Sequence, residues 1–180
     1  MRNLVLNGEG LELTLLRMAH EIAESNIPGD NLVLVGVQRG GVAVARRLIP
    51  LISSILEVSI PWGTLDVTMH RDDLEWHRVP EMRPTEIPFD LDSRNVVLVD
   101  DVLYHGRTVR AALDALHELG RPRCVQLAVL IDRGHRKLPI HADFVGKQIS
   151  TQSHERVFVR LGSEPGTGEV WLSEPSSTVL

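Results

Sequence analysis

The sequence predicts an α/β fold in which a mostly parallel, twisted sheet is flanked by helices and followed by a C-terminal β-hairpin. Two observations support this prediction. Short, continuous apolar runs recur at 32–37, 95–101 and 125–131, as is typical of strands buried on both faces. Segments with helical spacing of apolar residues alternate with these runs, and repeated strand–helix–strand units form parallel sheets.

The first half of the chain supplies two helices and two strands. Residues 11–25 carry apolar side chains at helical spacing, and the turn residues Pro28 and Gly29 follow this first predicted helix. The strand at 32–37 leads through a Gln-Arg-Gly-Gly turn into a second predicted helix at 42–57. Residues 58–69 then predict a strand with a Pro-Trp-Gly irregularity.

The second half begins with a polar segment, 70–88, that shows no convincing period. We expect a long flexible loop there, and such loops are often binding segments or lids. A helix is predicted at 108–119, because Gly120 and Pro122 supply a stop signal after it. Alternating segments on either side of a Gly/Pro loop predict a closing hairpin within 155–174.

Length and composition indicate one domain, 1–180, in a reducing compartment. A chain of 180 residues suits a single core, and it has no apolar run of the roughly 18 residues that a membrane span needs. The start of the chain does not resemble a signal peptide. Its single cysteine, Cys124, cannot form an internal disulfide and precedes an apolar run, so we expect a buried thiol. These features favour a cytoplasmic location.

Three predicted strands end in residues that are unusual for plain connections. These ends are Gln38-Arg39-Gly40-Gly41, Asp100-Asp101 with the residues up to Thr108, and Asp132-Arg133-Gly134. Ligands of parallel sheets bind beyond the carboxyl ends of the strands, and the topology brings these ends to one edge. The sequence therefore predicts one ligand site built from three connections.

The connection at 104–108 has the features of a phosphate site. It joins a strand to a helix, and the unpaired N–H groups at a helix N-terminus attract phosphate. Thr108 is expected either to cap the helix or to donate its hydroxyl to a phosphate oxygen. Asp100 and Asp101, just upstream, suit sugar hydroxyls or hydrated Mg²⁺. Phosphate, hydroxyls and Mg²⁺ together describe a sugar phosphate.

The stretch "VVLVDDVLYHGRT" at 96–108 resembles the phosphoribosyl pyrophosphate (PRPP) motif of type I phosphoribosyltransferases. The segments "RMAHEI", "DVTMHRDDL", "IPFDL" and "LAVLIDRGHRKLPI" extend the likeness over most of residues 17–151. With them the chain resembles the family of bifunctional pyrimidine operon regulators and uracil phosphoribosyltransferases. The resemblance implies a type I phosphoribosyltransferase fold, Mg²⁺ as cofactor, and PRPP, uracil and the uridine nucleotides UMP and UTP as ligands.

The same resemblance implies roles for individual residues. Asp100, Asp101 and Arg71 are the expected catalytic residues, with the two aspartates touching Mg²⁺ only indirectly, through the ribose. The 5-phosphate is expected on Tyr104, His105, Gly106, Arg107 and Thr108, pyrophosphate on Arg39, Gly40 and Gly41, and the base on Asp132 and Arg133. Two alternatives remain open: Arg39 as a plain surface residue, and Arg71 paired with Asp72 or Asp73.

Family likeness also implies binding to the leader RNA of pyrimidine biosynthetic transcripts, and assembly as a homodimer or homotetramer. The formal charge of −5 argues against indiscriminate binding of polyanions, but residues 121–147 hold six basic and two acidic side chains. RNA needs such a basic surface for its phosphates. The expected RNA-binding residues are Arg17, His20, Arg136, Lys137, His141 and Lys147. The alternative function is a nucleobase phosphoribosyltransferase of salvage without an RNA-binding role.

Some positions depart from the family pattern. His105 stands where the family has Thr or Ser, His70 replaces a Tyr, and Arg39 comes one position early in its turn. His141 replaces an Arg, which lowers the charge of the basic surface at pH 7. The backbone supplies most of the phosphate contacts, so His105 should affect PRPP affinity modestly. A protonated imidazole should improve that affinity at pH 6 relative to pH 8.

Overall fold

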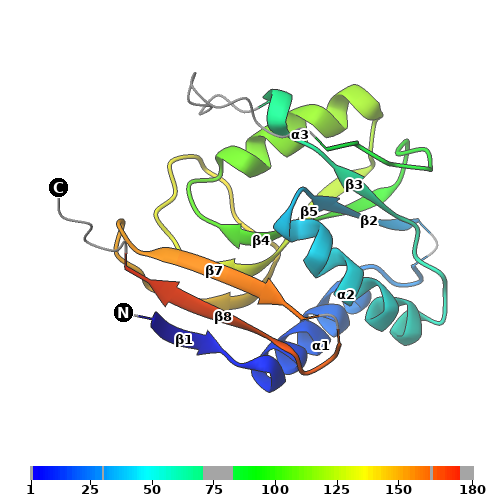
Figure 1. Ribbon diagram of the computed structural model, residues 1–180. Coiled ribbons are helices and arrows are strands. Elements are labelled where there is room, and N and C mark those ends of the chain that lie inside the picture. The colour runs from blue at the N-terminus through cyan, green and yellow to red at the C-terminus, as the bar shows by residue number, and fades with distance from the viewer. Residues whose placement is uncertain (1, 30, 71–82, 163, 175–180) are drawn as a thin grey trace.

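The computed structural model describes residues 2–29, 31–70, 83–162 and 164–174. Its central feature is a five-stranded sheet in which all paired neighbours run parallel (Figure 1). The strands lie in the order β3 (Trp62–Leu65), β2 (Leu32–Val37), β4 (Asn95–Leu103), β5 (Cys124–Asp132) and β6 (Phe144–Gln148). The α/β class and the parallel sheet are thereby confirmed.

Helices cover both faces of this sheet. α1 (Gly8–Ser25) and α2 (Gly40–Leu56) pack on one face and α3 (Arg107–Leu119) on the other (Figure 1). Side chains alternate between the two faces along each strand. Leu34 and Val97 therefore join the α1–α2 core, while Val35 and Leu98 join the α3 core. This double burial explains the continuous apolar runs in the sequence.

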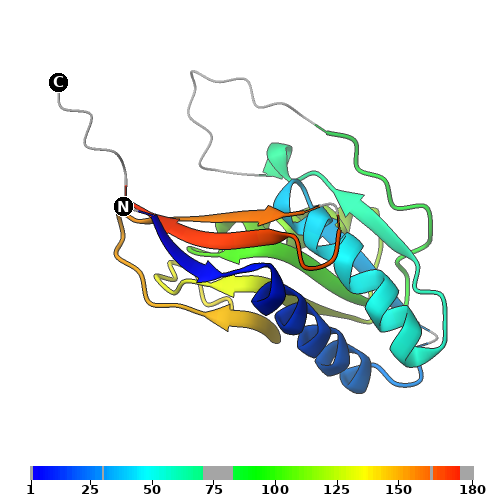
Figure 2. The ribbon, with the colours of Figure 1, turned by 60° about the horizontal axis from the view of Figure 1, so that its bottom comes forward.

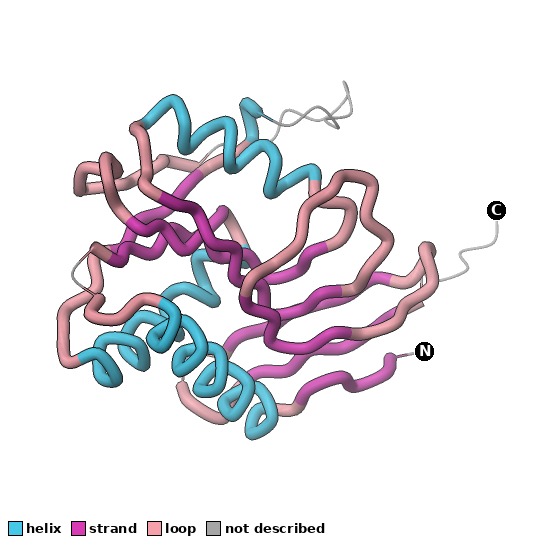
Figure 3. Tube along the Cα trace, turned by 180° about the vertical axis from the view of Figure 1, so that it is seen from behind, coloured by secondary structure: helices cyan, strands magenta, loops and turns pink. Residues whose placement is uncertain are grey.

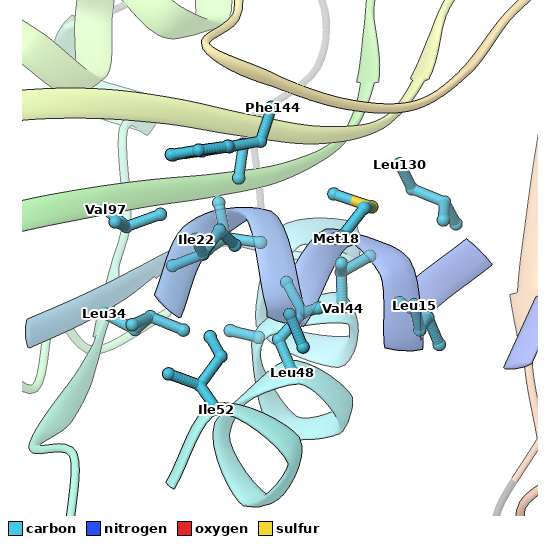
Figure 4. Close-up of a cluster of buried hydrophobic side chains, with 14 of the residues drawn as sticks. Leu15, Met18, Ile22, Leu34, Val44, Leu48, Ile52, Val97, Leu130 and Phe144 are labelled. Carbon is cyan, nitrogen blue, oxygen red and sulfur yellow. The ribbon is translucent and has the colours of Figure 1, made fainter. Parts of the chain in front are cut away.

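The α1–α2 core shows how the helices are fixed to the sheet. Leu15, Met18 and Ile22 of α1 meet Leu48 and Ile52 of α2, and Figure 4 shows all five over the same cluster. Each of these side chains is fully buried. The spacing of the α1 residues is the helical period from which the element was predicted.

A second, three-stranded antiparallel sheet lies beside the first, with strand order β1 (Arg2–Leu6), β8 (Gly168–Ser173), β7 (Arg156–Leu161) (Figures 1 and 2). β7 and β8 form the C-terminal hairpin, and β1 extends it at the β8 side. Along β7, exposed side chains alternate with partly buried ones, so one face of this sheet packs inward and the other faces outward.

Several elements differ from the sequence-based expectation. The strand expected at 58–69 is confined to β3, because Pro61 precedes it and the 3₁₀ helix η1 (Thr68–His70) takes up the rest. β1 and β6 were not predicted. β6 ends in the exposed Lys147 and Gln148, so its apolar run is too short to be distinguished, and β1 depends on pairing with a strand far along the chain.

The expectation of a buried thiol was wrong. Cys124 is exposed at the start of β5, and its Sγ lies 3.3 Å from Asn95 Oδ1. The buried run of β5 begins only at Leu127. Of the segment expected as a flexible loop, residues 71–82 lie outside the described residues, while Glu86 pairs with Thr64 of β3. Within the described ranges no helix has the length and apolar character needed to cross a bilayer.

Two leucines of α1 provide a test of the core. Leu15 is fully buried, whereas Leu13 is 63% exposed on the same helix. Leu15→Ala should lower the free energy of unfolding by about 2–5 kcal/mol, because it opens a cavity between α1 and the sheet. Leu13→Ala should change it by less than about 0.5 kcal/mol. Urea denaturation at equal protein concentration measures both, and equal destabilisation by the two changes would contradict the orientation of α1.

Candidate active site

The three unusual strand ends lie at one edge of the parallel sheet, as the polarity of its strands requires (Figures 1 and 3). Arg39 and Gly40 follow β2, Tyr104 follows β4, and Arg133 follows β5. The Arg133 N–H donates to Leu103 O at 3.1 Å, and the Lys137 N–H donates to His105 O at 3.0 Å. Direct hydrogen bonds thus join the second connection to the third.

Two glycines let the first connection approach the acidic end of β4. A Cβ on Gly40 would overlap the Asp101 carboxylate, and a Cβ on Gly41 would overlap Val99 O and lie 2.9 Å from Asp100 Cα. Any larger residue would push the turn away from the acids. The pair Gly40-Gly41, expected to allow a close approach to pyrophosphate, therefore also sets the distance between the turn and the β4 carboxylates.

The two acids at the end of β4 are anchored by the backbone beside them. Asp100 is only 6% exposed, and its Oδ1 accepts a hydrogen bond from the Asp101 N–H at 2.9 Å. Asp101 Oδ1 accepts from the Val102 N–H at 2.9 Å. Carboxylate oxygens are suitable donors for Mg²⁺. The described residues hold no cluster of three or more metal-ligating side chains, so an ion here would need ligands from a phosphate group or water.

The connection from β4 to α3 forms a cradle, which we define as residues 104–108. Gly106 has φ +92° and serves as the N-cap of α3, which starts at Arg107. A cavity of about 100 Å³ lies over this turn. The helix begins one residue earlier than expected, so Thr108 is not the cap; its hydroxyl remains available for a phosphate oxygen.

His105 does not extend freely from the cradle. Its ring stacks on Tyr104 at a centroid distance of 3.7 Å, and the Arg133 guanidinium lies 4.0 Å from the same Tyr104 centroid. Two groups so close to one ring centre must occupy opposite faces, so Tyr104 is sandwiched between them. Tyr104 Oη donates to Ser153 O at 3.3 Å. Desolvation lowers the pKa of His105, and the charges of Lys137, Arg107, Arg133 and His135 lower it further.

The residues expected to contact the base are bonded within the protein. Arg133 is 6% exposed and donates to Thr151 Oγ1 at 3.1 Å and Gln152 O at 2.9 Å. The Asp132 carboxylate accepts from the Gly134 N–H at 2.9 Å and pairs with Arg136. These partners hold the connection after β5 in place.

A cavity of about 630 Å³ lies on the α2 side of the first connection. Arg39 borders it, together with three arginines that sequence reasoning missed: Arg46, Arg47 and Arg83. The helical spacing of 39, 43, 46 and 47 was a signal for two of them. Arg83 carried no such signal. The peptide bond between Gln38 and Arg39 is cis, and Arg71 lies outside the described residues.

Asp66, which was also missed, holds the Arg83 end of the polar segment. Its carboxylate accepts from the Thr68 N–H at 2.7 Å and from the Arg83 N–H. Burial alone would raise the pKa of Asp66, but hydrogen bonds to Thr68 and Arg83, with the Arg39 charge, bring it below its ordinary value. Asp66 is therefore a stable anionic anchor beside Arg39.

The basic residues expected to bind RNA fall into two groups. Arg17 and His20 are exposed on α1, and the Arg17 guanidinium donates to Val145 O and Gly146 O of β6, next to the exposed Lys147. We call these three residues the α1–β6 surface. Lys137 and His141 are exposed on the connection after β5. Arg136 points inward: its guanidinium bonds Ile140 O, Tyr104 O and Asp132.

Comparisons with known proteins agree with this geometry. Residues 4–164 match the family model described as phosphoribosyl transferase domain. The chain is 52% identical over 172 residues to the Bifunctional protein PyrR of Deinococcus radiodurans, covering 95% of this chain and 94% of that one. It is 53% identical over 169 residues to the Bifunctional protein PyrR of Streptomyces coelicolor, covering 93% and 88%.

Solved structures support the fold alone. A hypoxanthine phosphoribosyltransferase from Staphylococcus aureus superposes with a TM-score of 0.67 at 19% identity, over 84% of this chain and 79% of that one. The family model covers most of the chain, and about half of the aligned residues are identical to those of the two relatives, whose length the chain nearly spans. The acidic strand end, the cradle and the glycine turn agree with these matches. The chain therefore belongs to the phosphoribosyltransferase family and, within it, to the proteins named bifunctional protein PyrR.

Proposed function

We propose that the protein transfers the phosphoribosyl group of PRPP to uracil, forming UMP and pyrophosphate, and that it regulates pyrimidine biosynthetic operons by binding their leader RNA. One observation carries the enzymatic part. An acidic strand end, a phosphate-sized cradle and an arginine-lined cavity meet at one edge of the sheet. The acidic strand end suits the ribose, the cradle suits the 5-phosphate, and the arginine-lined cavity suits the pyrophosphate.

In the reaction, the bond from ribose C1 to the pyrophosphate oxygen breaks, a bond from C1 to uracil N1 forms, and the N1 proton passes to the departing pyrophosphate or to solvent. Positive charge develops on the sugar, and negative charge on the leaving group. Asp100 and Asp101 bind the ribose hydroxyls and stabilise the cationic sugar, because their carboxylates are anchored before substrate arrives. They would also hold Mg²⁺ indirectly, through the ribose, and an ion there would supply positive charge to neutralise the pyrophosphate.

The remaining parts position the two ends of PRPP. N–H groups at the start of α3 hold the 5-phosphate, with Thr108 as hydroxyl donor. Arg39 and its neighbours around the larger cavity hold the pyrophosphate. Arg71, which lies outside the described residues, is assigned to the same group on the family resemblance alone. Asp132 and Arg133 form the floor under uracil by their fixed position, since their polar atoms are already bonded inside the protein. Catalysis then rests largely on positioning.

The regulatory part rests on the α1–β6 surface and on the relatives' name, Bifunctional protein PyrR. Phosphates of leader RNA would pair with Arg17, Lys147 and Lys137, and UMP or UTP in the active site would modulate the binding. We also propose a homodimer or homotetramer in the cytoplasm. A salvage phosphoribosyltransferase without an RNA-binding role is the competing function.

The catalytic proposal is tested by replacing one carboxylate with an uncharged amide of the same shape. Asp101→Asn removes the negative charge beside ribose and should lower kcat/KM for UMP formation by about 10²-fold, comparable to the effect of removing other preorganised electrostatic groups. Asp114→Asn, an exposed carboxylate on α3, is the matched control and should have no effect. Absence of UMP formation by the wild type with saturating PRPP, uracil and Mg²⁺ would reject the enzymatic function.

The RNA proposal is tested by filter binding with the protein's own pyrimidine operon leader transcript. Affinity should rise when UMP is added. The double variant Lys137→Gln/Lys147→Gln should weaken binding and reduce the slope of log K against log salt by about 0.7–0.9 for each phosphate that the variant no longer neutralises. Arg123→Gln, exposed at the opposite end of β5, is the control. Equal affinity for an unrelated RNA, or indifference to uridine nucleotides, would favour the salvage enzyme.

The lowered pKa of His105 predicts a pH-dependent stability. The unfolded chain binds a proton near the ordinary pKa of about 6.5, whereas the folded chain binds it only at lower pH. As pH falls from 8 through 6.5, wild-type protein should therefore lose stability relative to His105→Thr. The imidazole's benefit to PRPP affinity should likewise shift to a pH lower than the sequence suggested. Urea titrations of both proteins across this range, if parallel, would contradict the shift.

A further inference from the structure

The outward face of the three-stranded sheet carries an unusual set of side chains. Strand alternation turns Val157, Val159 and Val170 toward the core. Residues on the opposite face are apolar, aromatic or basic, with one carboxylate and one hydroxyl: Arg2, Leu4, Arg156, Phe158, Arg160, Glu169, Trp171 and Ser173. We call this set the hairpin face, and nothing in the proposed reaction uses it.

Aromatic rings stack across the strands of this face. Phe158 of β7 and Trp171 of β8 are register partners, and their rings are parallel within 10° at a centroid distance of 5.4 Å. The Arg2 guanidinium lies 4.1 Å from the Trp171 ring centre, so β1 contributes the end of the stack. Phe158 remains 40% exposed and Leu4 60% exposed, so the stack ends in accessible apolar surface.

Positive charge surrounds the rings. Arg156 and Arg160 flank Phe158 on the same face of β7 and are exposed. Within the described part of the chain, neither forms an ion pair. Glu169 is the one carboxylate of the hairpin face, and it already pairs with Arg2. Arg160 is the register partner of Glu169, whereas Arg156 lies opposite Ser173. An aromatic platform flanked by exposed arginines is the combination that binds single-stranded nucleic acid, since bases stack on the rings and phosphates meet the arginines.

The hairpin face continues from the α1–β6 surface. Lys147 Nζ donates to Val5 O at 3.1 Å, so the basic end of β6 touches β1, the edge strand of the hairpin sheet. A cavity of about 590 Å³ opens at the other edge, between Phe158 and the pair Tyr104 and Arg133. An RNA strand that follows the basic residues of α1 and β6 would reach the aromatic stack next, and the cavity beyond the stack leaves room for a base.

We propose that the hairpin face binds unpaired nucleotides of the regulated RNA, with a base on Phe158 and phosphates on Arg156 and Arg160. The proposal rests on the proposed RNA-binding function and adds a second, base-stacking surface to it. A second copy of this chain is a poorer occupant. The apolar part of the face comprises only three side chains, and a two-fold contact centred on Phe158 would bring its flanking arginines together.

Stacking and charge are tested separately, by filter binding of the leader transcript in the presence of UMP. Phe158→Ala should weaken binding about 5- to 150-fold, the range for removing one stacked base, and leave the salt slope unchanged. Phe158→Tyr should retain wild-type affinity. The double variant Arg156→Gln/Arg160→Gln should lower the salt slope by about 0.7 for each single-stranded phosphate that it no longer neutralises. Leu119→Ala, an exposed apolar residue at the end of α3, is the control.

Each result separates the possibilities. A duplex RNA of equal length without unpaired bases should bind wild type and Phe158→Ala equally. No RNA binding by wild-type protein would reject the regulatory function itself. RNA binding that Phe158→Ala leaves unchanged would overturn only the hairpin-face proposal. The proposal also fails if Phe158→Ala changes the sedimentation of the free protein, which indicates self-contact, or lowers UMP formation in parallel, which indicates a role in the reaction.

Discussion

The close approach of the turn after β2 to the acidic end of β4 is the constraint on which the rest of the site depends. It exists because Gly40 and Gly41 lack side chains where Asp101, Val99 and Asp100 leave no room. With that distance set, the start of α2 and the β4 carboxylates lie at a single edge. The arginines of α2 then face one flank of the site and the cradle faces the other.

Sequence patterns predicted the parts of the fold that depend on local rules. Continuous apolar runs identified β2, β4 and β5, and helical periods identified α1, α2 and α3. The sequence did not predict β1 and β6, because their stability comes from partner strands elsewhere in the chain rather than from their own composition. The same distinction applies to Cys124, whose exposure depends on where the β5 ladder becomes covered.

The site could be predicted in its chemistry but not in its internal bonding. Residue types and strand ends were enough to place Asp100, Asp101 and the cradle at one edge. They could not show that Arg136 is occupied by carbonyl oxygens and Asp132, or that His105 lies stacked on Tyr104. Arg83 and Asp66 were missed for a related reason: their proximity arises from the β3 edge, and no spacing in the sequence encodes it.

The bonding of the cradle has a consequence for any ligand that it holds. Backbone oxygens of Leu103, Tyr104 and His105 accept hydrogen bonds from Arg133, Arg136 and Lys137, so the cradle and the basic connection after β5 form one mechanical unit. Thermodynamic reciprocity governs such a unit. If a bound nucleotide changes the affinity for RNA by some factor, bound RNA must change the affinity for that nucleotide by the same factor. A transcript held at this connection would then regulate ligand binding in the active site, in addition to being regulated by it.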